Sequence, residues 1–148
     1  MAAGLTIDKN NFEDFSMRFN ELCSEYMKDA DFDVVHRVDS WIALMEADFR
    51  LLESLKSLKP FGLGNPTPNF ASRNVTVIGQ PRIVGGNHLK MILASGGTQV
   101  EAIGFDMGMR SVPRGQLDVL YNLKENLYMG YKSIQLNLID FREAVQRD

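Results

Sequence analysis

Apolar residues recur at helical spacing in the first part of the chain and alternate with polar residues in the second part. Spacings of three and four residues predict one amphipathic helix, whose start is marked by Asn10 and Glu13 as a capping box. Its apolar stripe consists of Phe12, Phe15, Phe19, Leu22 and Tyr26. Such a stripe normally faces a protein core, so we expect these side chains to be buried.

A second helical pattern follows a short apolar segment. Val34, Val35 and Val38 predict a short strand, and Asp39 or Ser40 is expected to cap the helix that follows. Apolar residues then repeat at near-helical spacing over residues 41–58. The helix must end before Pro60, because proline disfavours the helical conformation of the residue before it.

Residues 59–70 form a proline- and glycine-rich elbow between the two patterns. Its three prolines and two glycines can neither continue a helix nor lie inside a sheet. Phe61, Leu63 and Phe70 are too apolar for a flexible linker. We therefore expect an ordered elbow whose aromatic side chains pack against both neighbouring parts.

Alternation with a period of two predicts five strands after the elbow. The expected strands span residues 75–84, 88–93, 98–105, 117–123 and 134–138. Gly79 and Pro81 interrupt the first of them, which indicates a bend at a bulge. Residues 85–87 and 95–97 are turns, residues 106–110 a helical turn and residues 125–130 a loop, while the tail from Phe141 is expected to fray.

Three strands, a helical turn and two further strands are the order of an oligonucleotide-binding (OB) barrel. The predicted fold class is therefore α+β, with two N-terminal helices followed by a five-stranded OB-fold β-barrel. Other small barrels share this number of strands, so the order alone leaves them open. In an OB barrel the face of the second and third strands is the usual binding surface.

Charge is distributed unevenly along the chain, whose net charge is −3. Residues 1–58 hold 6 basic and 12 acidic residues, a balance of −6, whereas residues 59–148 hold 10 and 7, a balance of +3. A modestly basic barrel fits either a solvated surface or a phosphate-binding face. The single Cys23 and the lack of a signal-like or membrane-spanning segment favour a cytoplasmic protein without a membrane partner.

The sequence contains no self-sufficient catalytic motif, and we expect a binding protein without catalytic residues or a metal site. Asp29, Asp31 and Asp33 begin like a calcium loop, but Val34 stands where the turn requires glycine. Single-stranded nucleic acid needs cations for phosphates and flat rings on which bases stack. The candidates for phosphates are Arg82, His88, Lys90, Lys124 and Lys132, and those for stacking are Phe105, Tyr128 and Tyr131.

Several segments of the chain resemble the C-terminal part of the RecJ family of bacterial single-strand-specific exonucleases. They are Ala2-Ala3-Gly4-Leu5-Thr6, the elbow from Leu58 to Pro66, His88-Leu89-Lys90, Ala102-Ile103-Gly104-Phe105, Asn126-Leu127-Tyr128-Met129-Gly130 and Gln135-Leu136. The resemblance runs almost from end to end, and the Pro-Phe-Gly-x-Gly-Asn-Pro elbow is its most specific element. The resemblance implies the end of a DHHA1 domain over residues 1–28, a connecting segment and helix over 29–58, the elbow over 59–70 and an OB domain over 71–148.

The resemblance also implies a parent enzyme of DNA repair and recombination that degrades single-stranded DNA from its 5′ end. Its divalent metal, Mg or Mn, would be held by Asp-His-His-type motifs of a catalytic domain, and those motifs are absent from this sequence. We therefore expect the chain alone to be inactive and to hold no cofactor.

Single-stranded DNA is the main partner that the resemblance implies, with single-strand-binding or repair proteins as further candidates. The residues at family motif positions on or near the binding face are His88, Lys90, Asn126, Tyr128, Lys132 and Gln135. Met129 and Tyr131 stand where basic residues are expected. The alternative is a protein-interaction or interdomain bracing module with little DNA affinity of its own.

Overall fold

The structure is a computed structural model that describes residues 4–27 and 34–145. The chain divides into two compact units, Met1–His36 and Arg37–Asp148. The aspartates considered as a calcium loop, Asp29, Asp31 and Asp33, lie outside the described residues, as do Met1, Ala2 and Ala3.

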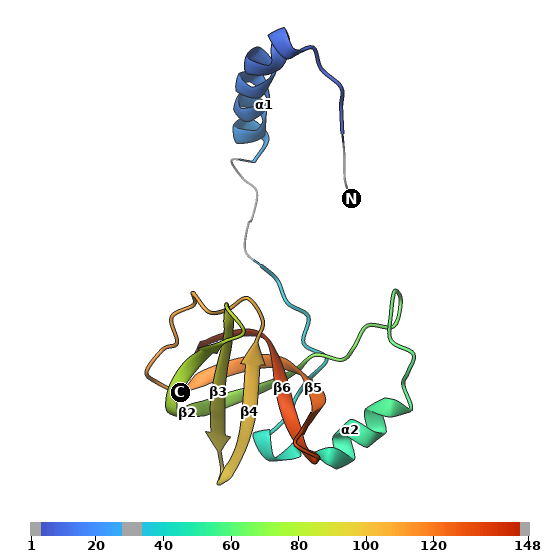
Figure 1. The fold of residues 1–148 in the computed structure, drawn as a ribbon, viewed down its shortest axis with the longest axis vertical. Helices are drawn as coiled ribbons and strands as arrows, with labels where there is room; N and C mark the ends of the chain where they lie inside the picture. The colour runs from blue at the N-terminus through green and yellow to red at the C-terminus, as the bar shows by residue number, and fades with distance from the viewer. Residues whose placement is uncertain (1–3, 28–33, 146–148) are drawn as a thin grey trace. The chain divides into compact units, whose positions relative to one another are not determined.

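The first unit contains a short 3-10 helix, η1 (Lys9–Asn11), that leads into helix α1 (Phe12–Tyr26; Figure 1). Asp8 caps η1, because its carboxylate accepts a hydrogen bond of 2.8 Å from the backbone N–H of Asn10. The N-cap of α1 is Asn11, which makes no side-chain cap hydrogen bond. The predicted capping box of Asn10 and Glu13 is therefore wrong, because α1 begins one residue later and its N-cap side chain makes no capping hydrogen bond.

The apolar stripe of α1 is exposed, which contradicts the prediction that it faces a core. No residue of α1 is buried, and Phe19 and Leu22 are 55% and 52% exposed. Phe15 stacks on Phe19 with ring centroids 5.6 Å apart, so the stripe contacts itself. Among the described residues of this unit there is no second helix or strand long enough to cover the stripe.

The second unit is a β-barrel (Figure 1). Its strands are β1 (Ser40–Trp41), β2 (Phe70–Val84), β3 (His88–Ser95), β4 (Thr98–Gly104), β5 (Leu117–Tyr128) and β6 (Tyr131–Glu143). They are ordered β1-β2-β3-β4-β6-β5, and β5 also pairs with β2, which closes the barrel. All pairs are antiparallel except β4 with β6 and the two-residue β1 with β2. The five-stranded barrel predicted from the sequence is therefore confirmed, with β1 as a short addition.

The segment before the elbow differs from its prediction. Residues 34–38 form no strand, and Ser40–Trp41 pair with β2 instead of beginning a helix. The backbone N–H of Ile42 donates to the carbonyl of Ala71 at 2.9 Å, which keeps this segment extended. A 3-10 helix, η2 (Leu44–Glu46), and helix α2 (Phe49–Lys56) follow, and Asp48 caps α2.

The elbow is ordered by hydrogen bonds, and not all of its apolar side chains are packed. The side-chain amide of Asn65 donates to the carbonyls of Leu58 and Pro60, at 2.8 and 2.9 Å. Phe70 is buried as the first residue of β2 and Phe61 is half-buried, but Leu63 is fully exposed.

The barrel core is built from the inward positions of the strands. Leu89, Met91 and Leu93 are buried, as their alternation predicts, and Leu44 and Leu52 extend the core to η2 and α2. β2 bends where predicted, since its register shifts between Ile78 and Arg82 and Gly79 has a φ of 70°.

A buried hydroxyl pair joins β2 to β5 inside the closed barrel. The hydroxyls of Ser72 and Tyr121 lie 2.8 Å apart, and Ser72 donates to the carbonyl of Ile42 at 2.8 Å. Since the single hydroxyl hydrogen of Ser72 is used there, Tyr121 is the donor to Ser72. Burial raises the pKa of Tyr121 to about 12.

The hairpin of β5 and β6 extends through the segment predicted as a loop. Only Met129 and Gly130 connect the strands, with φ of 48° and 83°, as a two-residue turn with positive φ at both positions requires. The predicted fraying from Phe141 is also wrong, because Phe141 is 4% exposed and β6 continues to Glu143. Residues 106–110 form turns rather than a helical element.

Candidate nucleic-acid interface

Strand register places the predicted site residues, except Lys132, on the outer face of the sheet. Leu89 and Leu136 point into the core, so their neighbours His88, Lys90 and Gln135 point outward. The residues on this outer face are Arg82 of β2, His88 and Lys90 of β3, Phe105 after β4, Lys124, Asn126 and Tyr128 of β5, and Tyr131 and Gln135 of β6. We call this surface the outer face.

Lys132 lies on the opposite side of the β5–β6 hairpin. It is opposite Leu127 in the register, on the same side as the buried Leu136 four pairs further along. Its ammonium is 3.0 Å from the carboxylate of Glu125, which neutralises it. The structure therefore does not bring Lys132 together with the other candidates.

One end of the outer face carries an aromatic ring between two basic side chains. The rings of His88 and Phe105 meet edge to face, with centroids 5.0 Å apart, and the ammonium of Lys124 lies 6.0 Å from the Phe105 centroid. The backbone N–H of Asp106 donates to Nδ1 of His88 at 3.1 Å, so the neutral imidazole carries its hydrogen on Nε2. Phe105 remains 48% exposed, so part of its side chain is accessible to a ligand.

The middle of the outer face is organised by Glu101 of β4. Its Oε2 lies 2.8 Å from the ammonium of Lys90, and its Oε1 accepts a hydrogen bond from the amide of Gln135. Glu101 is directly opposite Gln135 in the parallel pairing of β4 with β6. Sequence reasoning missed Glu101. A usable signal was present, because alternation places Glu101 outward in the third predicted strand, and the neighbouring strand carries an outward lysine.

Two cations of the outer face are not neutralised by acidic neighbours. Within residues 4–27 and 34–145, neither Arg82 nor Lys124 has a carboxylate at ion-pair distance. Both side chains belong to exposed residues. They are therefore better placed than Lys90 to attract a phosphate.

The tip of the hairpin is exposed and aromatic. Tyr128 and Tyr131 are opposite each other in the last pair of β5 and β6, and they are 70% and 81% exposed. Met129, in the turn between them, is 81% exposed. Flat rings at an exposed strand end provide surfaces on which bases can stack.

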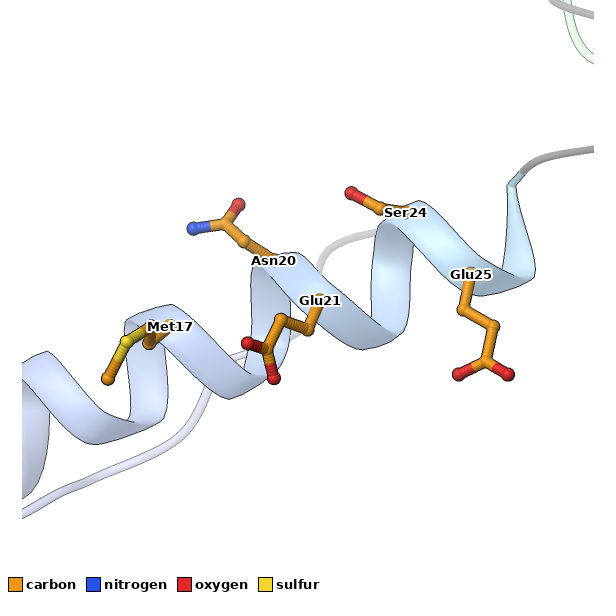
Figure 2. Close-up of a pocket in the computed structure, with 5 residues that line it drawn as sticks. All are labelled: Met17, Asn20, Glu21, Ser24 and Glu25. Carbon is orange, nitrogen blue, oxygen red and sulfur yellow. The ribbon is translucent and has the colours of Figure 1, made fainter.

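A shallow hollow on α1 offers no comparable site. The hollow in Figure 2 is lined by Met17, Asn20, Glu21, Ser24 and Glu25, which all belong to α1. Because one helix surface cannot enclose a ligand, we assign no site to this hollow.

The described residues bring together no group of three or more histidine, cysteine or acidic side chains that could hold a metal ion. They therefore do not fit the divalent metal that the family resemblance implies. None of the helices in the described ranges is long and apolar enough to cross a membrane.

Comparisons with known proteins agree with the barrel fold. The RecJ OB domain family matches residues 38–140, which is more than half of the chain. The single-stranded-DNA-specific exonuclease RecJ of Haemophilus influenzae is 32% identical, over 98% of this chain and 26% of the relative. The RecJ of Bacillus subtilis is 28% identical, over 95% of this chain and 18% of the relative.

A solved structure shares the fold. The crystal structure of RecJ from Thermus thermophilus in complex with Mn²⁺ covers 97% of this chain with a TM-score of 0.67, at 21% identity, and 21% of that protein is matched. The chain therefore spans about a fifth to a quarter of the length of these relatives.

Proposed function

The chain belongs to the RecJ OB domain family, and from this premise we propose that its barrel binds single-stranded DNA along the outer face. The observation that carries the proposal is that Arg82, Lys124 and exposed aromatic rings all project from the outer face. The two cations without acidic partners would attract phosphates, and the rings would stack on bases. Neither of these two kinds of contact depends on the identity of the base.

The barrel would serve an exonuclease whose chemistry lies in other residues. We propose that the parent protein, like the curated relatives, is a single-stranded-DNA-specific exonuclease, and that it degrades DNA from the 5′ end with a divalent metal. In this scheme the chain described here holds the strand and does not cleave it. Because its substrate would be bacterial DNA, we propose that it acts in the cytoplasm.

The test is fluorescence anisotropy of a labelled oligothymidylate titrated with this chain at two salt concentrations, with a matching duplex as the control. We expect preferential binding of the single strand, weakened by salt because each neutralised phosphate releases counterions. Absence of single-strand binding at low salt would contradict the proposal.

Two matched variants locate the binding surface. Lys124→Ala removes a cation of the outer face and should lower the salt slope of single-strand binding by about 0.7. Lys132→Ala removes a cation from the opposite side of the same hairpin, where it is paired with Glu125, and should leave the slope unchanged. Equal effects of the two variants would contradict the assignment of the outer face.

The exposed stripe of α1 favours a second candidate function, interdomain bracing. Phe12, Phe19 and Leu22 are each more than half exposed, and an amphipathic helix gains stability by covering such a stripe. Since this chain spans about a quarter of its Haemophilus influenzae relative, the proposed occupant is another domain of a protein of that length. Phe19→Ser and Leu22→Ser should then weaken the thermal stability of the full-length protein while leaving single-strand binding by the barrel unchanged.

A further inference from the structure

We infer that Glu101 makes the outer face select guanine over thymine in a bound single strand. This inference rests on the proposed function, because it assigns a base preference to the same face. The carboxylate of Glu101 lies in the middle of a surface proposed to bind a polyanion, where it would repel a phosphate. A carboxylate in such a place is suited to the hydrogen-bond donors of a base rather than to the backbone.

The carboxylate of Glu101 is held in a fixed orientation. Lys90 contacts one oxygen at 2.8 Å and Gln135 donates to the other, so each oxygen is positioned from a different neighbouring strand. A carboxylate oxygen accepts two hydrogen bonds, which leaves one acceptor position on each oxygen. The side chain is 31% exposed, so a ligand on the outer face can reach it.

The surroundings of Glu101 suit a base better than a phosphate. Ile92 is directly opposite Glu101 on β3 and is 40% exposed, while Ile103 follows two positions later on the same face of β4. Apolar side chains of this kind contact the flat surface of a base and exclude water from its edge. The phosphates would then lie toward Arg82 and Lys124, the cations without acidic partners.

Guanine is the base whose pairing edge matches two carboxylate oxygens. Its ring N–H and its exocyclic amino group are adjacent donors, so both oxygens of Glu101 can accept at once. Thymine presents one N–H between two carbonyls, which a carboxylate repels. Adenine and cytosine each present one amino group beside a ring nitrogen that is an acceptor. Unpaired bases leave these edges open, so a single strand is the substrate for which the choice can operate.

The experiment compares three labelled strands of about 15 nucleotides, a length within the range that one OB fold covers. The first strand is oligothymidylate, and the second carries guanines separated by thymines so that guanine quadruplexes cannot form. In the third strand hypoxanthine replaces each guanine, which removes only the exocyclic amino group. Binding of each strand to the whole chain is measured by anisotropy at one low salt concentration.

We expect the guanine strand to bind at least about fivefold more tightly than oligothymidylate, with the hypoxanthine strand between them. Glu101→Gln should bring this ratio close to one, because an amide offers one acceptor instead of two. The same variant should bind oligothymidylate more tightly than the parent chain, since Lys90 loses its charged partner. Glu125→Gln, the same substitution in the ion pair with Lys132, is the control and should preserve the ratio.

The affinities for the guanine strand and for oligothymidylate are compared within the same variant, so a general loss of folded protein cancels in their ratio. Equal affinities for the guanine and thymine strands, or a ratio that Glu101→Gln leaves unchanged, would overturn the inference while leaving single-strand binding intact. Failure of all three strands to bind would overturn the proposed function and this inference with it.

Discussion

The hydroxyl pair of Tyr121 and Ser72 gives a quantitative test of how the barrel closes. Tyr121 is fully buried and donates to Ser72, whose own hydrogen is used on the carbonyl of Ile42. Tyr121→Phe removes this hydrogen bond and leaves one acceptor position of Ser72 empty. We expect the free energy of unfolding to fall by about 1 kcal/mol at neutral pH, the usual net value for one hydrogen bond.

A sharper prediction is that this difference in the free energy of unfolding depends on pH. The pKa of Tyr121 is about 12 in the folded protein, against about 10 for an unfolded tyrosine. Because the pKa is raised on folding, the parent chain keeps its full stability below pH 10 and loses it as the pH rises toward 12. At about pH 11 the loss from this group is about 1.4 kcal/mol, since one pKa unit corresponds to about 1.4 kcal/mol. The Tyr121→Phe variant lacks this ionisable group and does not lose this stability. Near pH 11 the free energies of unfolding of the two proteins should therefore be about equal.

The assay is urea unfolding followed by circular dichroism, for both proteins, at neutral pH and at about pH 11. All other titrating groups are common to the two proteins, so their contributions cancel in the difference. A difference of about 1 kcal/mol that stays constant across this range would refute the reasoning, because it would mean that the Tyr121 hydroxyl is not desolvated in the folded barrel.

Three further substitutions test separate features of the fold by their effect on the free energy of unfolding. Met129→Asn should raise it by about 1 kcal/mol, because Met129 is 81% exposed at a φ of 48° that asparagine tolerates better; a decrease would contradict the two-residue turn. Phe141→Ala should lower it by about 3 to 5 kcal/mol, whereas a frayed tail would give almost no change. Asn65→Asp replaces the donor to the carbonyls of Leu58 and Pro60 by an acceptor and should cost about 2 kcal/mol, while an unchanged value would mean that these hydrogen bonds do not order the elbow.

The strands that line the core could be predicted because one pattern, the alternation of apolar and polar residues, determines both the extended conformation and the side to which each side chain points. In β3, alternation assigns Leu89, Met91 and Leu93 to the core and His88 and Lys90 to solvent, as the structure has them. The bend of β2 also followed from local chemistry, since Gly79 adopts a positive φ at the bulge.

Features that lie outside the barrel core were predicted less well. The end of the β5–β6 hairpin carries exposed residues on both strands around Glu125 and Asn126, so no alternation of apolar residues marks it. Backbone pairing extends these strands, and that pairing is fixed by the two-residue turn at Met129 and Gly130. In α1 the stripe was visible, but a sequence pattern indicates that a face can be buried without indicating its partner.

The candidate site was predictable residue by residue, but its internal contacts were not. Alternation assigned Lys90 to the outer face, whereas its pairing with Glu101 depends on the register between β3 and β4. The bridge from Glu101 to Gln135 depends on the parallel pairing of β4 with β6, which lie far apart in the sequence. The position of Lys132 depended on the turn, because a two-residue connection places it opposite Leu127.

The most direct test of the proposed binding face is an amide NMR titration of the isotope-labelled chain with oligothymidylate. Binding at the outer face predicts the largest shift changes at His88, Phe105, Lys124, Tyr128 and Tyr131, with small changes at Lys132 and Ile134 on the opposite side of the hairpin. Shift changes centred on Lys132 and Ile134, or confined to α1, would contradict the assignment of single-strand binding to the outer face.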